Sequence, residues 1–359
     1  MIKKLDLYII RKFLGTYFFS IALIISVAVI FDLSEKMDDF MEKGAPFSAI
    51  VFDYYLNFIP YFANLFSSLF TFIAVIFFTS KMAYNTEIIS ILASGVSYRR
   101  MLYPYLISAF VIFSLTYALS GYIIPPANKT RLEFEAQYLK KRRAKSLRNI
   151  HRQINPGEFV YMSSFNSNAN TGYSFSMEKF ENEELKSKLL SDYIKYDTAS
   201  QKWKIKNYYI RTFDGINEEI TSGKEIDTVL NMKPDDFKGD IKVIEAMNNL
   251  ELNDFIEQNR MQGSDYIEEI LVERYNRLAI PFSTFILTLI GVSLSSRKVR
   301  GGMGLHIGIG IGLSFVFILF QRFAASFAIS GTFPALISVW IPNTVFFLIA
   351  VYLYFRAPK

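Results

Sequence analysis

Six stretches of this chain contain no Asp, Glu, Lys or Arg and are long enough to cross a bilayer. They cover residues 13–31, 54–80, 101–128, 278–296, 301–321 and 323–355. A spanning helix needs about 20 mostly apolar residues, so all six stretches qualify. Gly331 and Pro334 predict a turn near the start of the last stretch, and the sixth helix is expected to begin near Pro334. The pattern predicts an α-helical membrane protein with six transmembrane helices.

A seventh charge-free stretch, residues 159–177, differs because its middle reads SSFNSNANTG. Lipid offers no hydrogen-bond partners to such side chains, so we expect this stretch to lie in water. A polar insertion therefore separates three helices from three others. The predicted domains are 1–128, with helices one to three, 129–275, the polar domain, and 276–359, with helices four to six.

The short loops on one side of the predicted bundle carry the basic residues. These are Lys3, Lys4, Arg11, Lys12, Lys81, Arg99, Arg100, Arg297, Lys298, Arg300, Arg356 and Lys359. Short loops rich in Lys and Arg face the cytoplasm. We therefore expect both termini to be cytoplasmic and the large domain to lie outside. The opposite short loop, 32–53, is mainly acidic; its spacing is typical of a solvated loop, although a cation or acid–base site is the alternative.

Composition narrows the function further. The chain is 51% hydrophobic, with 35 Phe and 22 Tyr, and its net charge is +6. Basic membrane loops explain this charge, and no compact basic surface predicts nucleic-acid binding. The chain has no Cys, and its two histidines, His151 and His306, are far apart in sequence. Disulfides and thiolate metal sites are thus excluded, and we predict no metal site.

No catalytic motif emerges from the residues. The chain contains no G-x-x-x-x-G-K-[ST] phosphate loop, no G-x-S-x-G elbow and no H-E-x-x-H pair. We therefore predict no catalytic residue and no cofactor bound by this chain. Any energy that the protein consumes would be supplied by another chain.

The insertion is expected to be an antiparallel β domain. Residues 202–213 form the clearest strand, in which Trp203, Ile205 and Tyr209 share one face, and Asp214 with Gly215 supplies a turn. Shorter candidates are 158–162, 173–177 and 193–196. The spacing favours a small sandwich or jelly roll. Helical stems are expected at 130–147 and 252–261.

The loop after the second helix predicts a short helix near residues 86–95. Asn85 or Thr86 can cap it, Glu87 favours its positive end, and Gly95 can stop it. Such a helix is about 13 Å long, too short to span a membrane. One face would present an apolar stripe to a partner groove, formed by Ile88, Ile91 and Leu92. The alternative is a helix that lies on the lipid surface.

The segment from Glu87 to Ser97, EIISILASGVS, resembles the coupling-helix motif of the YjgP/YjgQ permeases, the LptF/LptG subunits of the lipopolysaccharide-export ABC transporter. The expected fourth and fifth helices also resemble those of this family, at Glu273, Arg274, Pro281, Phe282, Gly291, Val292, Arg300, Gly302 and Gly304. The sixth helix adds Pro334, Ala335, Trp340, Pro342 and Asn343. The resemblance covers both membrane halves and includes the topology.

The resemblance implies a half-transporter of the bacterial inner membrane with a periplasmic β-jelly-roll domain. Its implied partners are a second six-helix permease, either a paralogue or a copy of itself, and a cytoplasmic ATPase dimer that binds ATP and Mg. Periplasmic bridge proteins would accept the extracted lipopolysaccharide. The implied ATPase contact comprises Glu87, Ile88, Ile91, Leu92, Gly95 and Ser97.

Lipopolysaccharide phosphates would need cations near the outer membrane surface. The candidates are Lys36, Lys43, Arg131, Arg274, Arg277 and Arg322. Arg322 is the strongest, because it interrupts two apolar runs and ionisable groups at such depth usually face a cavity or a partner. The alternative for each is an ordinary lipid headgroup or a neighbouring carboxylate.

A stripe of small residues on the fifth helix, Gly304, Gly308 and Gly312, allows another helix to approach closely. In the resembled family the first and fifth helices line the gate between subunits, so the stripe is either a sliding surface or a site of tight internal packing.

Three other functions remain compatible with the sequence. The chain could be an ABC permease for another envelope lipid. It could also be a membrane-anchored receptor or assembly factor that uses the β domain without an ATPase. An intramembrane enzyme is the third alternative, but the apolar runs offer almost no acid–base pairs.

Overall fold

The structure is a computed structural model that describes residues 3–139, 147–215, 217–237, 241–264, 266–297 and 302–357. The chain forms two compact units. The helical unit comprises Met1–Lys140, Glu245–Leu250 and Glu268–Lys359, and the sheet unit comprises Lys141–Ile244 and Glu251–Ile267. Residues 129–139, 245–250 and 268–275, which fall within the predicted polar domain 129–275, thus belong to the helical unit.

In its described residues the helical unit contains six helices that are long and apolar enough to cross a membrane, as the sequence predicts. Two of them are built from several segments that run on without a break. The six are α1(Lys4–Glu42); α2(Phe47–Ala49) with η1(Ile50–Tyr55) and α3(Leu56–Tyr84); α5(Tyr98–Ala118) with η2(Leu119–Ile123) and α6(Ile124–Tyr138); α9(Ile267–Ser295); α10(Gly302–Ile329); and α11(Ala335–Arg356). Pro334 is the N-cap residue of α11, which confirms the predicted turn.

Helix α1 is much longer than the apolar stretch that predicts it. Its 39 residues correspond to about 58 Å, roughly twice the 30 Å hydrocarbon core of a bilayer. The acidic residues between positions 32 and 42 therefore lie on a helix, and the expectation of a solvated loop there is wrong. The charge-free pattern predicts that the helix ends before Asp32, whereas its backbone hydrogen bonds continue to Glu42.

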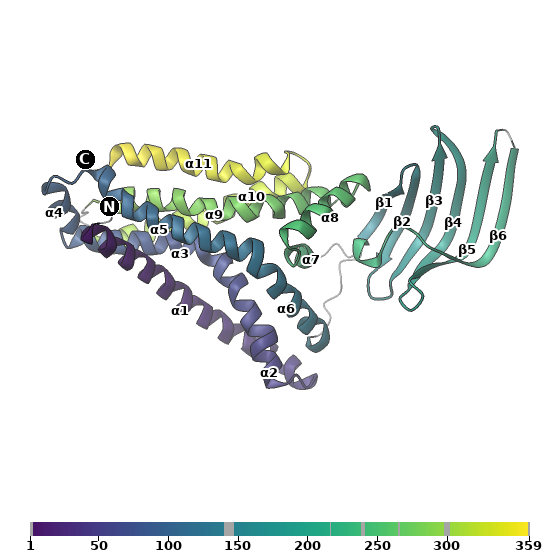
Figure 1. The fold of residues 1–359 in the computed structure, drawn as a ribbon, viewed down its shortest axis with the longest axis horizontal. Helices are drawn as coiled ribbons and strands as arrows, with labels where there is room; N and C mark the ends of the chain where they lie inside the picture. Colours follow the sequence, from purple (N-terminus) through teal and green to yellow (C-terminus); the bar gives the residue numbers. More distant parts are fainter. Residues whose placement is uncertain are drawn as a thin grey trace. The chain divides into compact units, whose positions relative to one another are not determined.

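Helix α3 is at the centre of the bundle and packs against α1, α6 and α10. Its buried side chains, such as Phe72 and Val75, join one core cluster with residues of α1, α5, α9, α10 and α11. Helix α4(Glu87–Ala93) lies with both chain termini at one end of the bundle, here called the α4 end (Figure 1). Helix α2 lies at the opposite end, called the α2 end.

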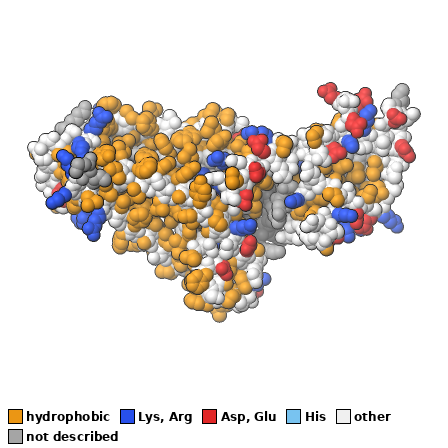
Figure 2. Space-filling view, viewed as in Figure 1, with side chains coloured by type: hydrophobic (Ala, Val, Ile, Leu, Met, Phe, Trp, Pro, Cys, Tyr) orange, Lys and Arg blue, Asp and Glu red, His pale blue; other side chains and the backbone are white. Residues whose placement is uncertain are grey.

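Hydrophobic side chains cover the surface of the helical unit between these ends, and Lys and Arg side chains gather at the α4 end (Figure 2). Soluble proteins rarely expose an apolar surface of this size, so a lipid environment accounts for it. The exposed aromatic residues on this surface include Phe19, Phe110, Phe315 and Phe323.

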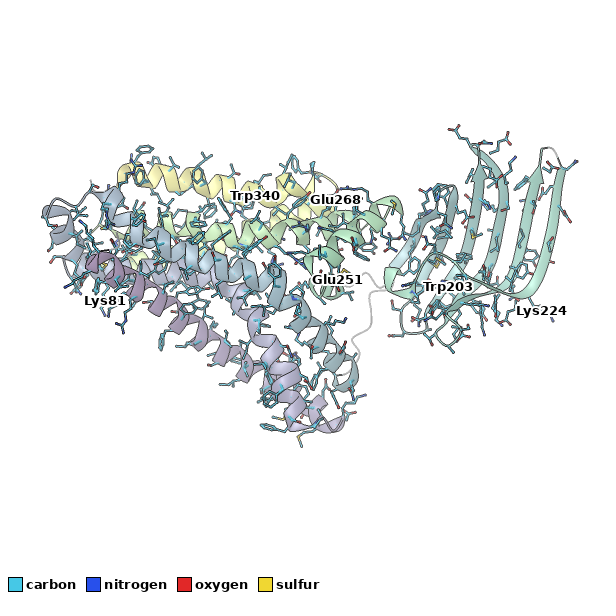
Figure 3. The ribbon with its side chains drawn as sticks, viewed as in Figure 1. Lys81, Trp203, Lys224, Glu251, Glu268 and Trp340 are labelled. Carbon is cyan, nitrogen blue, oxygen red and sulfur yellow. The ribbon has the colours of Figure 1, made fainter. Side chains whose placement is uncertain are left out.

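The sheet unit confirms the predicted antiparallel β class. Six strands pair with their sequence neighbours in one sheet: β1(Leu147–Asn155), β2(Glu158–Asn166), β3(Thr171–Glu181), β4(Glu184–Asp197), β5(Lys202–Asp214) and β6(Asn217–Thr228). Short turns join successive strands, so the strand order follows the sequence. One face carries the core around Trp203, whose position Figure 3 shows.

A line of irregular residues crosses the whole sheet. Along this line the regular pairing is interrupted without a change of register at Asn149, Ser163, Ser174, Asp192, Asn207 and Lys224. Register shifts occur elsewhere in the sheet, between Gln153 and Asn155 and between Lys179 and Phe180. Asn149, Ser174 and Asn207, on alternate strands, have positive φ angles of 54°, 51° and 52°. We call this line the crease.

The crease reverses which residues face the core. In β5, Trp203 and Ile205 are buried before Asn207, whereas Tyr208 and Ile210 contact the core after it. The prediction that Tyr209 shares a face with Trp203 is therefore wrong, and Tyr209 is exposed. Strict alternation places residues two apart on one face, but a left-handed residue between them shifts the pattern by one.

Helix α8(Asn249–Met261) confirms the second expected stem. Within the sheet unit it is fixed to β1 by a hydrogen bond of 3.1 Å from Arg152 Nη1 to Asn259 Oδ1. The first expected stem is shorter than predicted, because α6 ends at Tyr138. Residues 140–146 lie outside the described part of the chain, and Leu147 begins β1.

Candidate functional site

The short helix predicted after the second membrane helix is α4. Glu87 is its first residue, and Gly95, with a φ of 86°, follows its end. The positive φ explains a glycine at this position. Thr86 occupies the N-cap position, but its hydroxyl donates to the carbonyl oxygen of Asn85 at 2.6 Å and does not cap the helix. Ser97 caps α5, because its hydroxyl accepts a hydrogen bond from Arg100 N.

The apolar stripe of α4 is turned inward. Ile88 is completely buried in the main core of the bundle, and Ile91 and Leu92 pack against that core. The expectation that this stripe projects toward a partner is therefore wrong, because the bundle itself provides the apolar surface that covers it. The outward face consists of Ile89, which is 52% exposed, with Ser90, Ala93 and Ser94. Sequence periodicity identified the face but not its direction.

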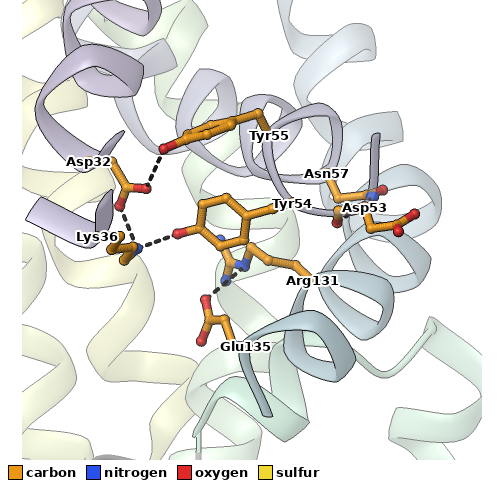
Figure 4. A network of polar contacts seen from close by, with 8 residues as sticks. All are labelled: Asp32, Lys36, Asp53, Tyr54, Tyr55, Asn57, Arg131 and Glu135. Carbon is orange, nitrogen blue, oxygen red and sulfur yellow. Dashed lines mark hydrogen bonds and ion pairs between the residues drawn. The ribbon is translucent and has the colours of Figure 1, made fainter. Parts of the chain in front are cut away.

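A polar cluster lies at the α2 end, where α1 meets η1 (Figure 4). Lys36 is bonded to both Asp32 and Tyr54, and Tyr55 Oη lies 3.4 Å from Asp32 Oδ2. The side chains of Lys36 and Asp32 are only 23% and 15% exposed. Neither tyrosine was singled out from the sequence. The Tyr-Tyr pair that directly follows Asp53 was the available signal.

Arg131 of α6 lies beside this cluster. It is 5% exposed, and its Nε atom is 3.6 Å from Glu135 Oε1. Its guanidinium also lies over the ring of Tyr61, 5.0 Å from the ring centroid. Tyr54 and Phe134 pack together in the surrounding aromatic cluster. The cluster thus brings two of the six predicted cations, Lys36 and Arg131, into one region.

Arg277 of α9 is buried and bonded within the helical unit. Its guanidinium contacts Glu273 Oε1 at 3.3 Å, Asn249 Oδ1 at 2.9 Å and the carbonyl oxygen of Met247 at 2.8 Å. These bonds fasten the segment Glu245–Leu250 to the bundle. A substrate phosphate would have to displace them to reach Arg277.

The remaining predicted cations differ in exposure. Lys43, just after α1, and Arg322 on α10 are exposed, and neither has an ion-pair partner among the described residues. Arg274 on α9 is half-buried and has partners of its own. Lys43 and Arg322 are therefore the candidates whose charges are most open to an anion.

The glycine stripe of α10 faces open space. A Cβ atom added at Gly304, Gly308 or Gly312 would lie within 4 Å of no described atom beyond its own stretch of helix. Neighbouring Gly310 behaves differently, because a Cβ atom there would lie 2.3 Å from Ile76 Cδ1 of α3. Close packing inside the chain thus uses Gly310, and the other three glycines leave a smooth surface for something outside it.

Within the described ranges no group of three or more His, Cys, Asp or Glu side chains could hold a metal ion. The geometry instead combines six membrane helices, a large extramembrane sheet and a short helix anchored at one end of the bundle. These features define a multi-pass membrane protein with a large extramembrane β domain.

The family model for the lipopolysaccharide export system permease LptF/LptG matches residues 7–356. The chain therefore belongs to the LptF/LptG family, which makes it a permease subunit of a lipopolysaccharide export system and not itself an enzyme. No curated protein matches the sequence.

Proposed function

We propose that this chain forms half of the membrane channel that extracts lipopolysaccharide from the outer leaflet of the inner membrane. A second six-helix permease, either a paralogue or another copy, would complete the channel, and a cytoplasmic ATPase dimer would drive it. The observation that carries the proposal is the position of α4, a short helix anchored in the bundle core at the end where basic residues gather. These basic residues support a cytoplasmic location for the α4 end.

Energy coupling requires a rigid element that the ATPase can hold. The buried side chain of Ile88 anchors α4 to the bundle, so α4 would move together with the membrane helices. The outward face of α4 presents Ile89, Ser90 and Ala93 to the partner. Glu87, at the start of α4, adds a carboxylate for a cation of the ATPase. Gly95 and Ser97 set the turn that connects α4 to α5. ATP and Mg would be bound by the partner.

Substrate recognition would use the cations at the α2 end. Lys43 and Arg322 would meet the lipid phosphates first, because their charges are exposed. Lys36 would join them when a phosphate competes with Asp32 for its ammonium group. Arg131, Arg274 and Arg277 remain candidates whose present partners must first be exchanged. The sheet unit would then accept the lipid and pass it to periplasmic bridge proteins.

The proposal is tested by purifying the tagged chain from its native envelope in mild detergent and identifying bound proteins and lipids by mass spectrometry. We expect a cytoplasmic ATPase, a six-helix permease and lipopolysaccharide. An ATPase with a different lipid would support export of another envelope lipid. No ATPase, under conditions that preserve other membrane complexes, would contradict the proposal and favour a membrane-anchored receptor.

A further inference from the structure

The first turns of α1 are fastened to the chain on both sides of α4. Tyr8 Oη donates a hydrogen bond of 3.1 Å to Glu87 Oε2, at the start of α4. Asp6 accepts two hydrogen bonds from Arg100, in the first turn of α5, at 2.8 Å and 2.6 Å. Helix α1 therefore holds the segment from Glu87 to Arg100 at both of its ends.

The contact between Asp6 and Arg100 is the more directional of the two. Asp6 is 2% exposed, and its carboxylate also accepts a hydrogen bond of 2.7 Å from the backbone N–H of Lys3. A bidentate pair of a guanidinium and a carboxylate fixes both distance and orientation. The apolar packing of the main core, to which Ile9 and Ile88 both belong, is non-directional and would allow sliding. The ion pair thus prevents α1 from slipping past the α4 segment.

Helix α1 runs without interruption from this clamp to the polar cluster at the α2 end. Asp6 and Lys36 lie on the same helix, 30 positions apart, which corresponds to about 45 Å along the axis. The helix contains no proline from Lys4 to Glu42, so its backbone hydrogen bonds resist stretching and carry a displacement along the axis from one end to the other. A displacement at Asp6 would therefore reach Lys36 and its partner Tyr54.

We infer that Asp6 and Arg100 are positioning residues that couple α4 to α1, and that Tyr8 orients Glu87 for the ATPase. Movement of α4 is then transmitted along α1 to the cation cluster around Lys36. This inference rests on the proposed function, because it assigns a path to ATP-driven movement. Neither Asp6 nor Arg100 touches the substrate in this scheme.

The test uses the complex of the full chain with its ATPase and second permease, reconstituted in liposomes with lipopolysaccharide. The variants are Asp6→Asn, Arg100→Ala and the exchange Asp6→Arg with Arg100→Asp, and Arg99→Ala is the control because Arg99 is exposed. We expect each single variant to lower the lipid delivered per ATP hydrolysed about 10-fold, within the usual range of coupling between sites. ATP hydrolysis and ATPase binding should stay within about 2-fold of the unmodified complex. The exchange should restore delivery in part, and Arg99→Ala should leave it unchanged.

A distance measurement separates coupling from a merely structural role. The chain has no cysteine, so labels can be attached at Ser94→Cys, just after α4, and Met41→Cys on α1 without background from this chain. With Asp6 intact, nucleotide should leave this distance unchanged, because α4 and α1 move together. In Asp6→Asn the distance should become nucleotide-dependent.

Two results would overturn the inference: unchanged delivery per ATP in Asp6→Asn, or a loss that merely follows a loss of ATPase binding. Failure of the proposed function is recognised separately, because the unmodified complex would then show no ATP-driven delivery at all.

Discussion

Asn207 Nδ2 donates a hydrogen bond of 2.8 Å to Asp192 Oδ2 across the crease of the sheet. This bond joins β5 to β4 where the regular pairing is interrupted. Asn207 has a φ of 52°, a conformation that Asn tolerates better than other non-glycine residues. The side chain thus both permits the left-handed backbone and replaces part of the missing pairing.

We therefore predict that Asn207→Val destabilises the sheet unit by about 2 kcal/mol, because a β-branched residue is strained at positive φ. Asn207→Gly should cost less, since it loses only the hydrogen bond. Chemical unfolding of the full chain in detergent measures both effects. The chain has two tryptophans, so Trp340→Phe leaves Trp203 as the fluorescent reporter of this unit. Equal stability of the Val and Gly variants would show that the backbone conformation at Asn207 is unimportant.

The Asp32–Lys36 pair leads to a prediction about the α2 end. Lys36→Ala would leave the largely buried carboxylate of Asp32 without its cation, and we expect a loss of about 3 kcal/mol of stability. The double variant Asp32→Asn with Lys36→Met should recover much of this loss. Lys43→Ala is the control, because Lys43 is exposed. Thermal unfolding in detergent provides the comparison, and Lys36→Ala as stable as Lys43→Ala would contradict the prediction.

Glu87 and Gly95 test the role of α4. Glu87→Arg should reduce copurification of the ATPase at least about 10-fold, because a cation would then face the cation expected in the partner. Gly95→Pro should have the same effect by a different route, since proline cannot adopt the φ of 86° at this turn. Membrane insertion should persist in both variants.

The control for α4 is Glu219→Arg, the same charge reversal at an exposed residue of the sheet unit. Normal ATPase recovery and normal lipid transport in both α4 variants would contradict the proposed contact between α4 and the ATPase.

The glycines of α10 predict two separable defects. Gly310→Leu should destabilise the single chain, because its side chain would collide with Ile76. Gly308→Leu should leave the fold intact, since the space around Gly308 is open, but should weaken association with the second permease about 10-fold. Thermal unfolding and the oligomeric state in detergent distinguish these outcomes. Unchanged association in Gly308→Leu would remove this stripe from the proposed gate.

The sequence by itself determined the six membrane helices, the turn before Pro334, the antiparallel β class and the short helix α4. Each follows from local patterns, namely apolar length, alternation and turn residues, which act between residues close in the chain. Tertiary structure decided which way those patterns face. Tertiary packing buries Ile88 in the core and places Asp32 and Lys36 on a helix against Tyr54. It also reverses, at Asn207, which residues of β5 face the core. These outcomes depend on contacts between residues distant in sequence, and periodicity carries no information about the direction in which a face will find its partner.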